Sequence, residues 1–187
     1  TLSYAPLHQE LRVMQLIDAY RTFGHLEAKV NPIALGGVEE KKPLNLSYLG
    51  FTDEEMDLLF PTCGIMPQES APLRNIVNWL KETYCGKIGI EYMGTENLDL
   101  EEWIQKRIEP NRFKVTLPLE TKRRILDLLN HSELFEKFLH TKFVGQKRFS
   151  LEGGETLIPI IATVIESLSK AGGEEFVIGM AHRGRLN

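Results

Sequence analysis

The segment SAPLRNIVNWLKETYCG, residues 70–86, sets the fold class of this chain. Its apolar side chains recur at spacings of three and four residues, which is the period of one face of an α-helix. Ser70 and Pro72 favour the start of a helix, and Gly86 favours its end. We therefore predict an amphipathic helix that reaches Tyr84 and buries one face, made of Leu73, Ile76, Val77, Leu80 and Tyr84.

Other segments with the same period surround this helix and make most of the chain helical. The first would bury a stripe that includes Leu11 and Met14, and another would bury Trp103. A tight connection at His131 would separate the two helices on either side of it. The further helices that we expect span about 7–23, 53–60, 99–108, 119–130, 132–141 and 155–171.

Two segments have the composition of β-strands. Residues 88–93 alternate in polarity and are rich in Ile and Tyr, which predicts a strand or an extended segment. Residues 176–180 form a continuous apolar run, as in a strand buried on both faces of a parallel sheet. We therefore expect a mostly α fold, with a helical N-terminal domain over 1–141 and the first elements of an incomplete α/β domain over 142–187.

Composition and charge exclude several classes of protein. The chain has 187 residues, with 22 basic and 26 acidic side chains, and this net charge of −4 argues against a broad nucleic-acid interface. No window has the length of a membrane span, and the first residues lack the layout of a secretory signal. Cys63 and Cys85 have no metal-binding spacing, so we expect reduced thiols and a cytoplasmic protein.

Basic side chains gather around the expected helix and strand of the second domain. A helix that precedes a parallel strand begins at the sheet edge where that strand ends, and this edge binds ligands in open sheets. The topology brings Arg148 toward His182, Arg183 and Arg185. Guanidinium groups bind carboxylates and phosphates bidentately. The sequence therefore predicts an anion site at this edge.

Two glycine amides would add donors to this site. Gly153 and Gly154 open the helix over 155–171, and the N-terminus of a helix favours anions. Each residue also has a simpler interpretation: a basic turn such as Lys147-Arg148 is often a solvated loop, and His182 can be a structural histidine. Their convergence at one edge favours a functional site.

Several motifs resemble one enzyme family. KRFSLEG at 147–153, Ile-Pro at 158–159 and GMAHRGRLN at 179–187 closely resemble the thiamine-dependent decarboxylating component of the 2-oxoglutarate dehydrogenase complex. Upstream segments, among them DAYR at 18–21 and GIEYM at 89–93, are similar to that family in the same order. The resemblance covers nearly the whole chain.

The resemblance implies a fold, a reaction and a set of partners. It implies a thiamine-diphosphate-binding α/β domain after the helical part, and oxidative decarboxylation of 2-oxoglutarate with succinyl transfer to a lipoyl group in the citric acid cycle. His182 would be the active-site histidine, Arg183 would contact thiamine diphosphate, and Arg148 and Arg185 would bind substrate or another anion. The cofactors implied are thiamine diphosphate and magnesium, and the partners are the dihydrolipoyl succinyltransferase component and a second copy in a homodimer. The compartment implied is the bacterial cytoplasm or the mitochondrial matrix.

The chain also departs from the family's pattern. Gly94 stands where many bacterial members have a histidine, and the Gly-Asp-Gly…Asn motif that holds the metal is absent. We therefore expect no metal ligand in this chain and no turnover by the chain alone. Two other hypotheses stay open: a non-catalytic helical interaction module, favoured by the acidic helical part over 1–141, and a relative that acts on 2-oxoadipate.

Overall fold

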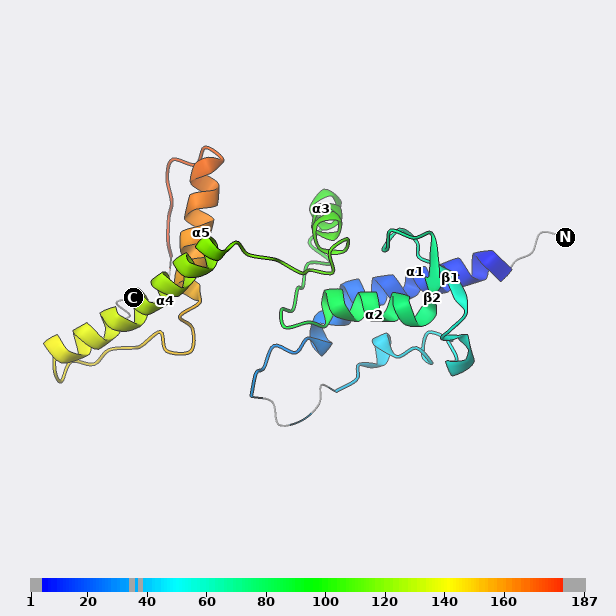
Figure 1. Ribbon diagram of the computed structural model, residues 1–187, viewed down its shortest axis with the longest axis horizontal. Helices are drawn as coiled ribbons and strands as arrows, with labels where there is room; N and C mark the ends of the chain where they lie inside the picture. The colour runs from blue at the N-terminus through cyan, green and yellow to red at the C-terminus, as the bar shows by residue number, and fades with distance from the viewer. Residues whose placement is uncertain (1–4, 34–35, 37–38, 180–187) are drawn as a thin grey trace. The chain divides into compact units, whose positions relative to one another are not determined.

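The computed structural model describes residues 5–33, 36 and 39–179, and these residues are mostly helical. The two short strands, β1 (Leu59–Pro61) and β2 (Ser70–Pro72), pair in an antiparallel sheet. Single 3₁₀ turns occupy Gly24–Glu27, Lys42–Leu44 and Asp53–Glu55. The expected mostly α fold is confirmed by the helices α1 (Ala5–Phe23), α2 (Leu73–Tyr84), α3 (Leu98–Ile108), α4 (Leu119–Lys142) and α5 (Leu157–Lys170) (Figure 1).

The chain divides into two compact units, residues 1–115 and 116–187. We expected a domain boundary near residue 141, and the structure instead groups α4 with α5, which it contacts. The boundary at 141 stays a prediction. None of the helices in the described residues is long and apolar enough to cross a membrane.

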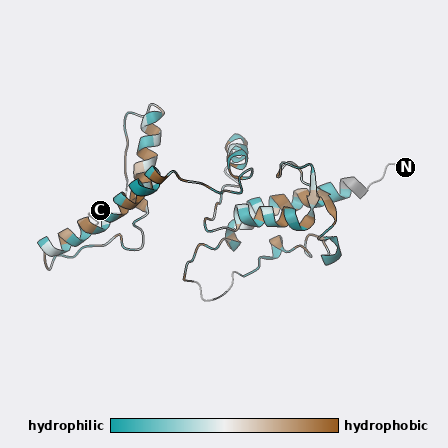
Figure 2. Cartoon of the chain, in the orientation of Figure 1, coloured by the Kyte–Doolittle hydropathy of each residue, from teal (hydrophilic) through white to brown (hydrophobic). Residues whose placement is uncertain are grey.

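The first unit has a hydrophobic core between α1, α2 and the β1–β2 hairpin. Figure 1 shows α1 and α2 side by side, and Figure 2 shows the hydrophobic stripes that they carry. Every side chain that we predicted on the apolar face of α2 is buried. The 3₁₀ turn after α1 begins at Gly24, where a Cβ atom would lie 2.5 Å from the Cβ of Tyr84. Glycine is therefore required for this close approach of α1 to α2.

The predicted helix over 7–23 is confirmed as α1, but the predicted buried stripe is wrong at Leu11 and Met14. Leu11 and Met14 are 51% and 47% exposed, whereas the face that packs on α2 and the hairpin holds Val13, Leu16, Ile17 and Tyr20. Both stripes have the period of a helix, so periodicity alone cannot choose between them. Packing against α2 makes the choice.

The predicted helix over 53–60 is wrong beyond its first turn. The capping signal is real, because the Glu55 carboxylate accepts a hydrogen bond from the Thr52 backbone N–H at 2.9 Å. After one 3₁₀ turn the chain becomes extended, because β1 pairs with β2 from Leu59–Pro72 to Pro61–Ser70. Ladder hydrogen bonds over 59–61 replace the helical ones.

Neither predicted strand forms a ladder among the described residues. Residues 88–93 are extended or turn-like, and they are held by side chains such as Tyr92, which is 4% exposed. Residues 176–179 form no strand, and Met180 lies outside the described residues. A strand needs a partner to satisfy its backbone groups, and the described residues supply none beside these segments.

The predicted connection at His131 is also wrong, because α4 is one continuous helix. Residues 119–142 contain neither Gly nor Pro. The i,i+4 ion pair Glu133–Lys137 spans the helix just after this point, and Nδ1 of His131 lies 3.5 Å from the Asp127 carboxylate on the preceding turn. Histidine and serine have middling helix propensity and do not by themselves end a helix.

The helix over 99–108 is confirmed as α3, but Trp103 does not lie in the core. Asn97 caps α3 by accepting a hydrogen bond from the Leu100 N–H at 3.0 Å, and Ile108 is buried. Trp103 is 58% exposed. The apolar face of α3 is therefore narrower than the sequence pattern predicts.

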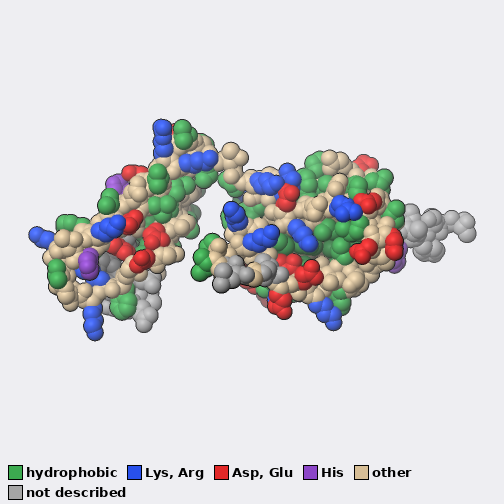
Figure 3. All heavy atoms as spheres, turned by 60° about the horizontal axis from the view of Figure 1, so that its bottom comes forward, with side chains coloured by type: hydrophobic (Ala, Val, Ile, Leu, Met, Phe, Trp, Pro, Cys, Tyr) green, Lys and Arg blue, Asp and Glu red, His purple; other side chains and the backbone are tan. Residues whose placement is uncertain are grey.

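The second unit has few buried side chains. Leu151 is the hydrophobic residue of this unit that is most buried among those described, at 7% exposure. Large apolar side chains of α4, α5 and the segments between them are exposed, including Phe138 at 59% and Ile160 at 53%. Figure 3 shows hydrophobic side chains at the surface beside charged ones. This unit buries far less apolar surface than the first.

Candidate functional site

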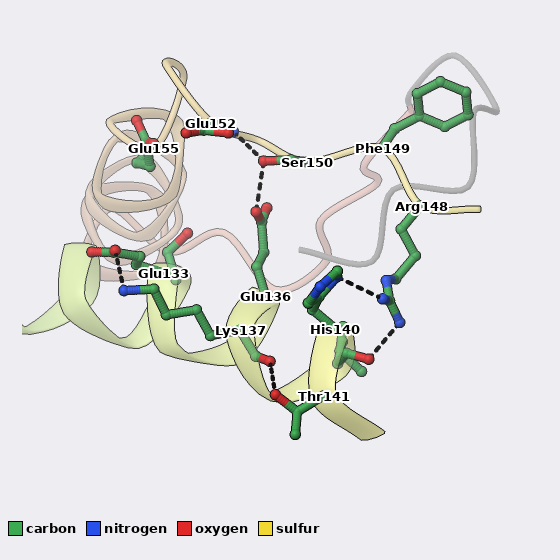
Figure 4. A pocket seen from close by; sticks show the side chains of 12 residues that line it. Glu133, Glu136, Lys137, His140, Thr141, Arg148, Phe149, Ser150, Glu152 and Glu155 are labelled. Atoms are coloured by element: carbon green, nitrogen blue, oxygen red, sulfur yellow. Dashed lines mark hydrogen bonds and ion pairs between the residues drawn. The ribbon is translucent and has the colours of Figure 1, made fainter. Parts of the chain in front are cut away.

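A pocket of about 580 Å³ lies in the second unit, between α4 and the segment that leads to α5 (Figure 4). Arg148 lines this pocket, and it is the one arginine of the predicted anion site that lies among the described residues. Side chains of α4 form one wall, and residues 148–155 form the other. The charged and titratable residues that line it are Glu133, Glu136, Lys137, His140, Arg148, Glu152 and Glu155.

Arg148 caps the C-terminus of α4. Its guanidinium donates hydrogen bonds to the carbonyl oxygens of Leu139 and Phe143, the latter at 3.0 Å, and lies 3.3 Å from Nδ1 of His140. The last carbonyls of a helix lack partners within the helix and carry a partial negative charge, so a cation is stabilised there. Much of the hydrogen-bonding capacity of Arg148 is therefore used within the chain, and its role toward a substrate or another anion stays a prediction.

Glu136 holds the other wall of the pocket in place. Its carboxylate accepts hydrogen bonds from the Ser150 hydroxyl and from the Leu151 N–H, both at 2.7 Å. The Ser150 oxygen in turn accepts one from the Glu152 N–H at 2.8 Å. Figure 4 shows the Glu136 side chain directed from α4 toward Ser150. The motif residues 150–152 are thus tied to α4.

The two glycine amides expected to receive an anion are occupied. The Gly153 N–H donates to the Glu155 carboxylate at 2.9 Å, and the Gly154 N–H donates to the Leu151 carbonyl at 2.7 Å. Gly153 has φ +86°, a conformation that suits glycine at this turn. The expectation of free amides at this turn is therefore wrong, because the turn satisfies its own backbone.

The pocket has mixed charge and is richer in carboxylates than in cations. The cationic site that we expected includes His182, Arg183 and Arg185, and all three lie outside the described residues. Their convergence with Arg148 stays a prediction. Among the described residues, no group of His, Cys, Asp and Glu is arranged to hold a metal ion.

Sequence reasoning missed the α4 side of the pocket. Glu136 and His140 are four residues apart, which places them on one face of a helix. A polar helix face of this kind is usually solvated, and His140 looked isolated in the sequence. Only the contact of Ser150 and Arg148 with α4 gives these two side chains a role.

A second cluster of titratable groups lies in the first unit, around Glu109 at the end of α3. Its carboxylate accepts hydrogen bonds from Arg21 at 2.8 and 3.1 Å and from the Tyr84 hydroxyl at 2.5 Å. The Tyr84 hydroxyl also lies 3.2 Å from that of Tyr92. Burial, followed by the charge of Glu109, raises the pKa of Tyr84 well above its usual range. The backbone carbonyl of Glu109 accepts a bond from the Trp79 indole at 3.0 Å.

This Glu109 cluster joins α1, α2 and α3. Glu109 is 7% exposed, and the carboxylate has donors for both of its oxygens. A buried charge that is fully paired in this way holds elements together and leaves little capacity for a ligand. We therefore interpret the cluster as structural.

Comparison with known proteins identifies relatives of this chain along nearly its whole length. The 2-oxoglutarate dehydrogenase E1 component of Cupriavidus necator is 44% identical over 92% of the chain, and that of Azotobacter vinelandii is 38% identical over 96%. The multifunctional 2-oxoglutarate metabolism enzyme of Mycolicibacterium vanbaalenii is 42% identical over 94%. No family model matches the chain.

The chain spans only 18%, 19% and 14% of the lengths of these three relatives. The similarity nevertheless covers both structural units, because more than nine-tenths of the chain is aligned in each comparison. It agrees with the resemblance of the motifs at 147–153 and 179–187. The chain therefore belongs to the family of 2-oxoglutarate dehydrogenase E1 components and corresponds to less than a fifth of the length of its relatives.

Proposed function

We propose that this chain is the N-terminal part of a thiamine-diphosphate-dependent 2-oxoglutarate dehydrogenase. The observation that carries the proposal is identity of 38–44% over 92–96% of the chain to relatives named for 2-oxoglutarate. The parent enzyme would decarboxylate 2-oxoglutarate oxidatively and transfer the succinyl group to a lipoyl group of the dihydrolipoyl succinyltransferase component. It would act as a cytoplasmic homodimer within a multienzyme complex.

In this proposal, residues 142–187 contribute to the cofactor and substrate site of the longer polypeptide. His182 would move a proton beside the cofactor and substrate, since an imidazole changes protonation near neutral pH. Arg183 would bind the diphosphate, and Arg185 would bind a carboxylate of the substrate. Arg148 would contribute positive charge while it caps α4. When bound, thiamine diphosphate supplies the electron sink for decarboxylation.

The described residues alone do not form a diphosphate site. The amides of Gly153 and Gly154 and the guanidinium of Arg148 already have partners within the chain. Magnesium ligands would come from sequence outside this chain. We therefore expect the isolated chain to be inactive.

Two assays test the proposal. The isolated chain, incubated with 2-oxoglutarate, thiamine diphosphate, magnesium and an artificial electron acceptor, should give no reduction, and sustained reduction would contradict the proposed partial site. In the full-length parent, His182→Ala should lower turnover with 2-oxoglutarate at unchanged folding stability. The matched control is His131→Ala, because the His131 side chain is 70% exposed on α4. Equal turnover by the two variants would contradict the assignment of His182 to the active site.

A second candidate function is a non-catalytic helical interaction module of a dehydrogenase complex. The first unit closes its own hydrophobic core, while the second exposes much of its apolar surface, as an interaction module does. Binding of the 187-residue chain to the succinyltransferase component can be compared with binding of a variant that has Ala at 182, 183 and 185. Tight binding that is unchanged in the variant would favour the interaction module.

The substrate of the parent also has an alternative, 2-oxoadipate. The names of the relatives favour 2-oxoglutarate. Steady-state kinetics of the full-length parent with both acids, compared as kcat/KM, decides between them. A higher value with 2-oxoadipate would overturn our choice.

A further inference from the structure

A groove of about 600 Å³ on the first unit combines exposed apolar side chains with cations. It lies between the second half of α3 and the segment 111–115 that follows it. None of its lining residues is acidic, although the chain as a whole has a net charge of −4. The charged residues that line the groove are therefore positive, whereas the chain as a whole is negative.

The apolar part of the groove has a fixed floor and exposed walls. Ile108 is 5% exposed and belongs to the core, and Phe113 packs against that core. Trp103 and Val115 are 58% and 69% exposed. Trp103 and Val115 therefore present adjoining apolar surface to the groove, and the indole offers the largest apolar area of any side chain there.

The cations of the groove differ in how far they are neutralised. Lys106 forms an ion pair with Glu102 at 2.6 Å on α3. Arg107 forms no ion pair with the carboxylates of the described residues, and its guanidinium carbon lies 5.3 Å from the centroid of the Trp103 ring. A planar guanidinium held beside an indole keeps its outer donors available for a carboxylate.

We propose that this groove docks an acidic segment of a partner polypeptide in which a carboxylate stands next to a large apolar side chain. The apolar side chain would cover Trp103 and Val115, and the carboxylate would pair with Arg107. The two charged residues of the lining, Lys106 and Arg107, are both cations, and only Lys106 is paired within the chain, so the groove favours a negatively charged occupant. Tryptophan and arginine are also the residues that most often dominate protein interfaces. The inference uses the first unit alone and does not depend on the proposed function.

The test measures binding of two synthetic peptides to the 187-residue chain by isothermal titration calorimetry. The probe is acetyl-AELEFEA-amide, and its matched neutral counterpart is acetyl-AQLQFQA-amide. We expect the acidic peptide to bind about tenfold more tightly than the neutral one, with affinity that falls as salt is added. The tryptophan emission maximum of the chain should shift to shorter wavelength, because the Trp103 ring leaves water, and Trp103→Phe should abolish the shift.

Matched variants locate the interaction. Arg107→Gln should weaken binding of the acidic peptide about threefold or more, as expected for the loss of a charge pair at a partly exposed site. Trp103→Phe should weaken both peptides. Arg123→Gln removes an exposed cation of α4 that lies outside the groove and should change nothing. All these positions are exposed, and circular dichroism checks that each variant remains folded.

Three outcomes would overturn the proposal. The first is that the acidic peptide does not bind at concentrations up to about 1 mM. A dissociation constant of about 1 mM corresponds to a binding free energy of only about −4 kcal/mol. The second is equal weakening by Arg107→Gln and Arg123→Gln, which would mean diffuse attraction to the chain. The third is a concentration-dependent dimer in sedimentation that Arg107→Gln abolishes, because a second copy would then occupy the groove in place of a partner.

Discussion

Replacing Arg21 with methionine removes the cation that neutralises the buried carboxylate of Glu109. The two side chains are joined by hydrogen bonds of 2.8 and 3.1 Å, and they are 23% and 10% exposed. Removing one partner of a fully buried pair costs about 3–5 kcal/mol, because the other charge is left without a partner. Arg21 is partly exposed and the Tyr84 hydroxyl still donates to Glu109, so we expect Arg21→Met to cost about 2–3 kcal/mol at pH 7.

Tryptophan fluorescence during urea unfolding measures this cost for the first unit alone. The chain has two tryptophans, Trp79 and Trp103, and both lie in the first unit. The Trp79 indole donates to the Glu109 carbonyl, so its emission also reports on the cluster itself. Small domains are stable by only about 5–15 kcal/mol, so the expected loss is a large shift of the midpoint.

A double variant separates the loss of the pair from the cost of an unpaired charge. Arg21→Met combined with Glu109→Gln leaves no buried charge in the Glu109 cluster, so we expect it to be more stable than Arg21→Met alone by about 1–2 kcal/mol. Arg74→Met breaks the exposed pair with Asp57 and should leave the midpoint unchanged. The reasoning would be refuted if Arg21→Met had no more effect than Arg74→Met, or if the double variant were the least stable.

Three further predictions concern the first unit. Gly24→Ala should lower stability by about 1–3 kcal/mol, measured by urea unfolding, because the new Cβ would overlap the Cβ of Tyr84. Iodoacetamide should modify Cys63 well before Cys85 in the folded chain, read by mass spectrometry: Cys63 is exposed, whereas Cys85 is buried and burial raises its pKa to about 11. Hydrogen bonds from the Arg12 guanidinium and, to a smaller extent, from the Thr52 backbone N–H lower the pKa of the Glu55 carboxyl to about 2. The contribution of Glu55 to the free energy of unfolding is therefore present above about pH 4.5 and lost as pH falls toward 2. Glu55→Gln should make the free energy of unfolding, measured by urea, fall less steeply between about pH 4.5 and 2. The same steepness in the variant would contradict the Arg12–Glu55 pair.

The sequence alone predicts the helices with one clear apolar face and distinct ends. α2 is the best case, because its five predicted core side chains are all buried and it ends at Tyr84, as predicted. α3 and α5 are predicted to within two residues of their observed ends for the same reason. Local signals of this kind act through the backbone and the nearest turn, so they need no knowledge of the rest of the chain.

Tertiary contacts decide the features for which local signals conflict or are silent. Residues 59 and 60 belong to the helix predicted over 53–60, but pairing with β2 makes 59–61 a strand. Which face of α1 is buried depends on packing against α2, since Leu11 and Val13 fit equally periodic stripes. The hydrophobic pattern of a segment does not indicate which other helix or strand of the chain it will pack against.

The candidate site divides in the same way. Sequence motifs assign the family and predict His182, Arg183, Arg185 and Arg148 as site residues, because side-chain chemistry and spacing are properties of the sequence. Only the tertiary structure shows that Arg148 caps α4 and that Glu136 holds the turn before α5. The Glu136–Leu151 contact joins residues 15 apart in the chain, so it depends on how the loop packs on α4, and the position of Arg148 at the end of α4 follows from the same packing.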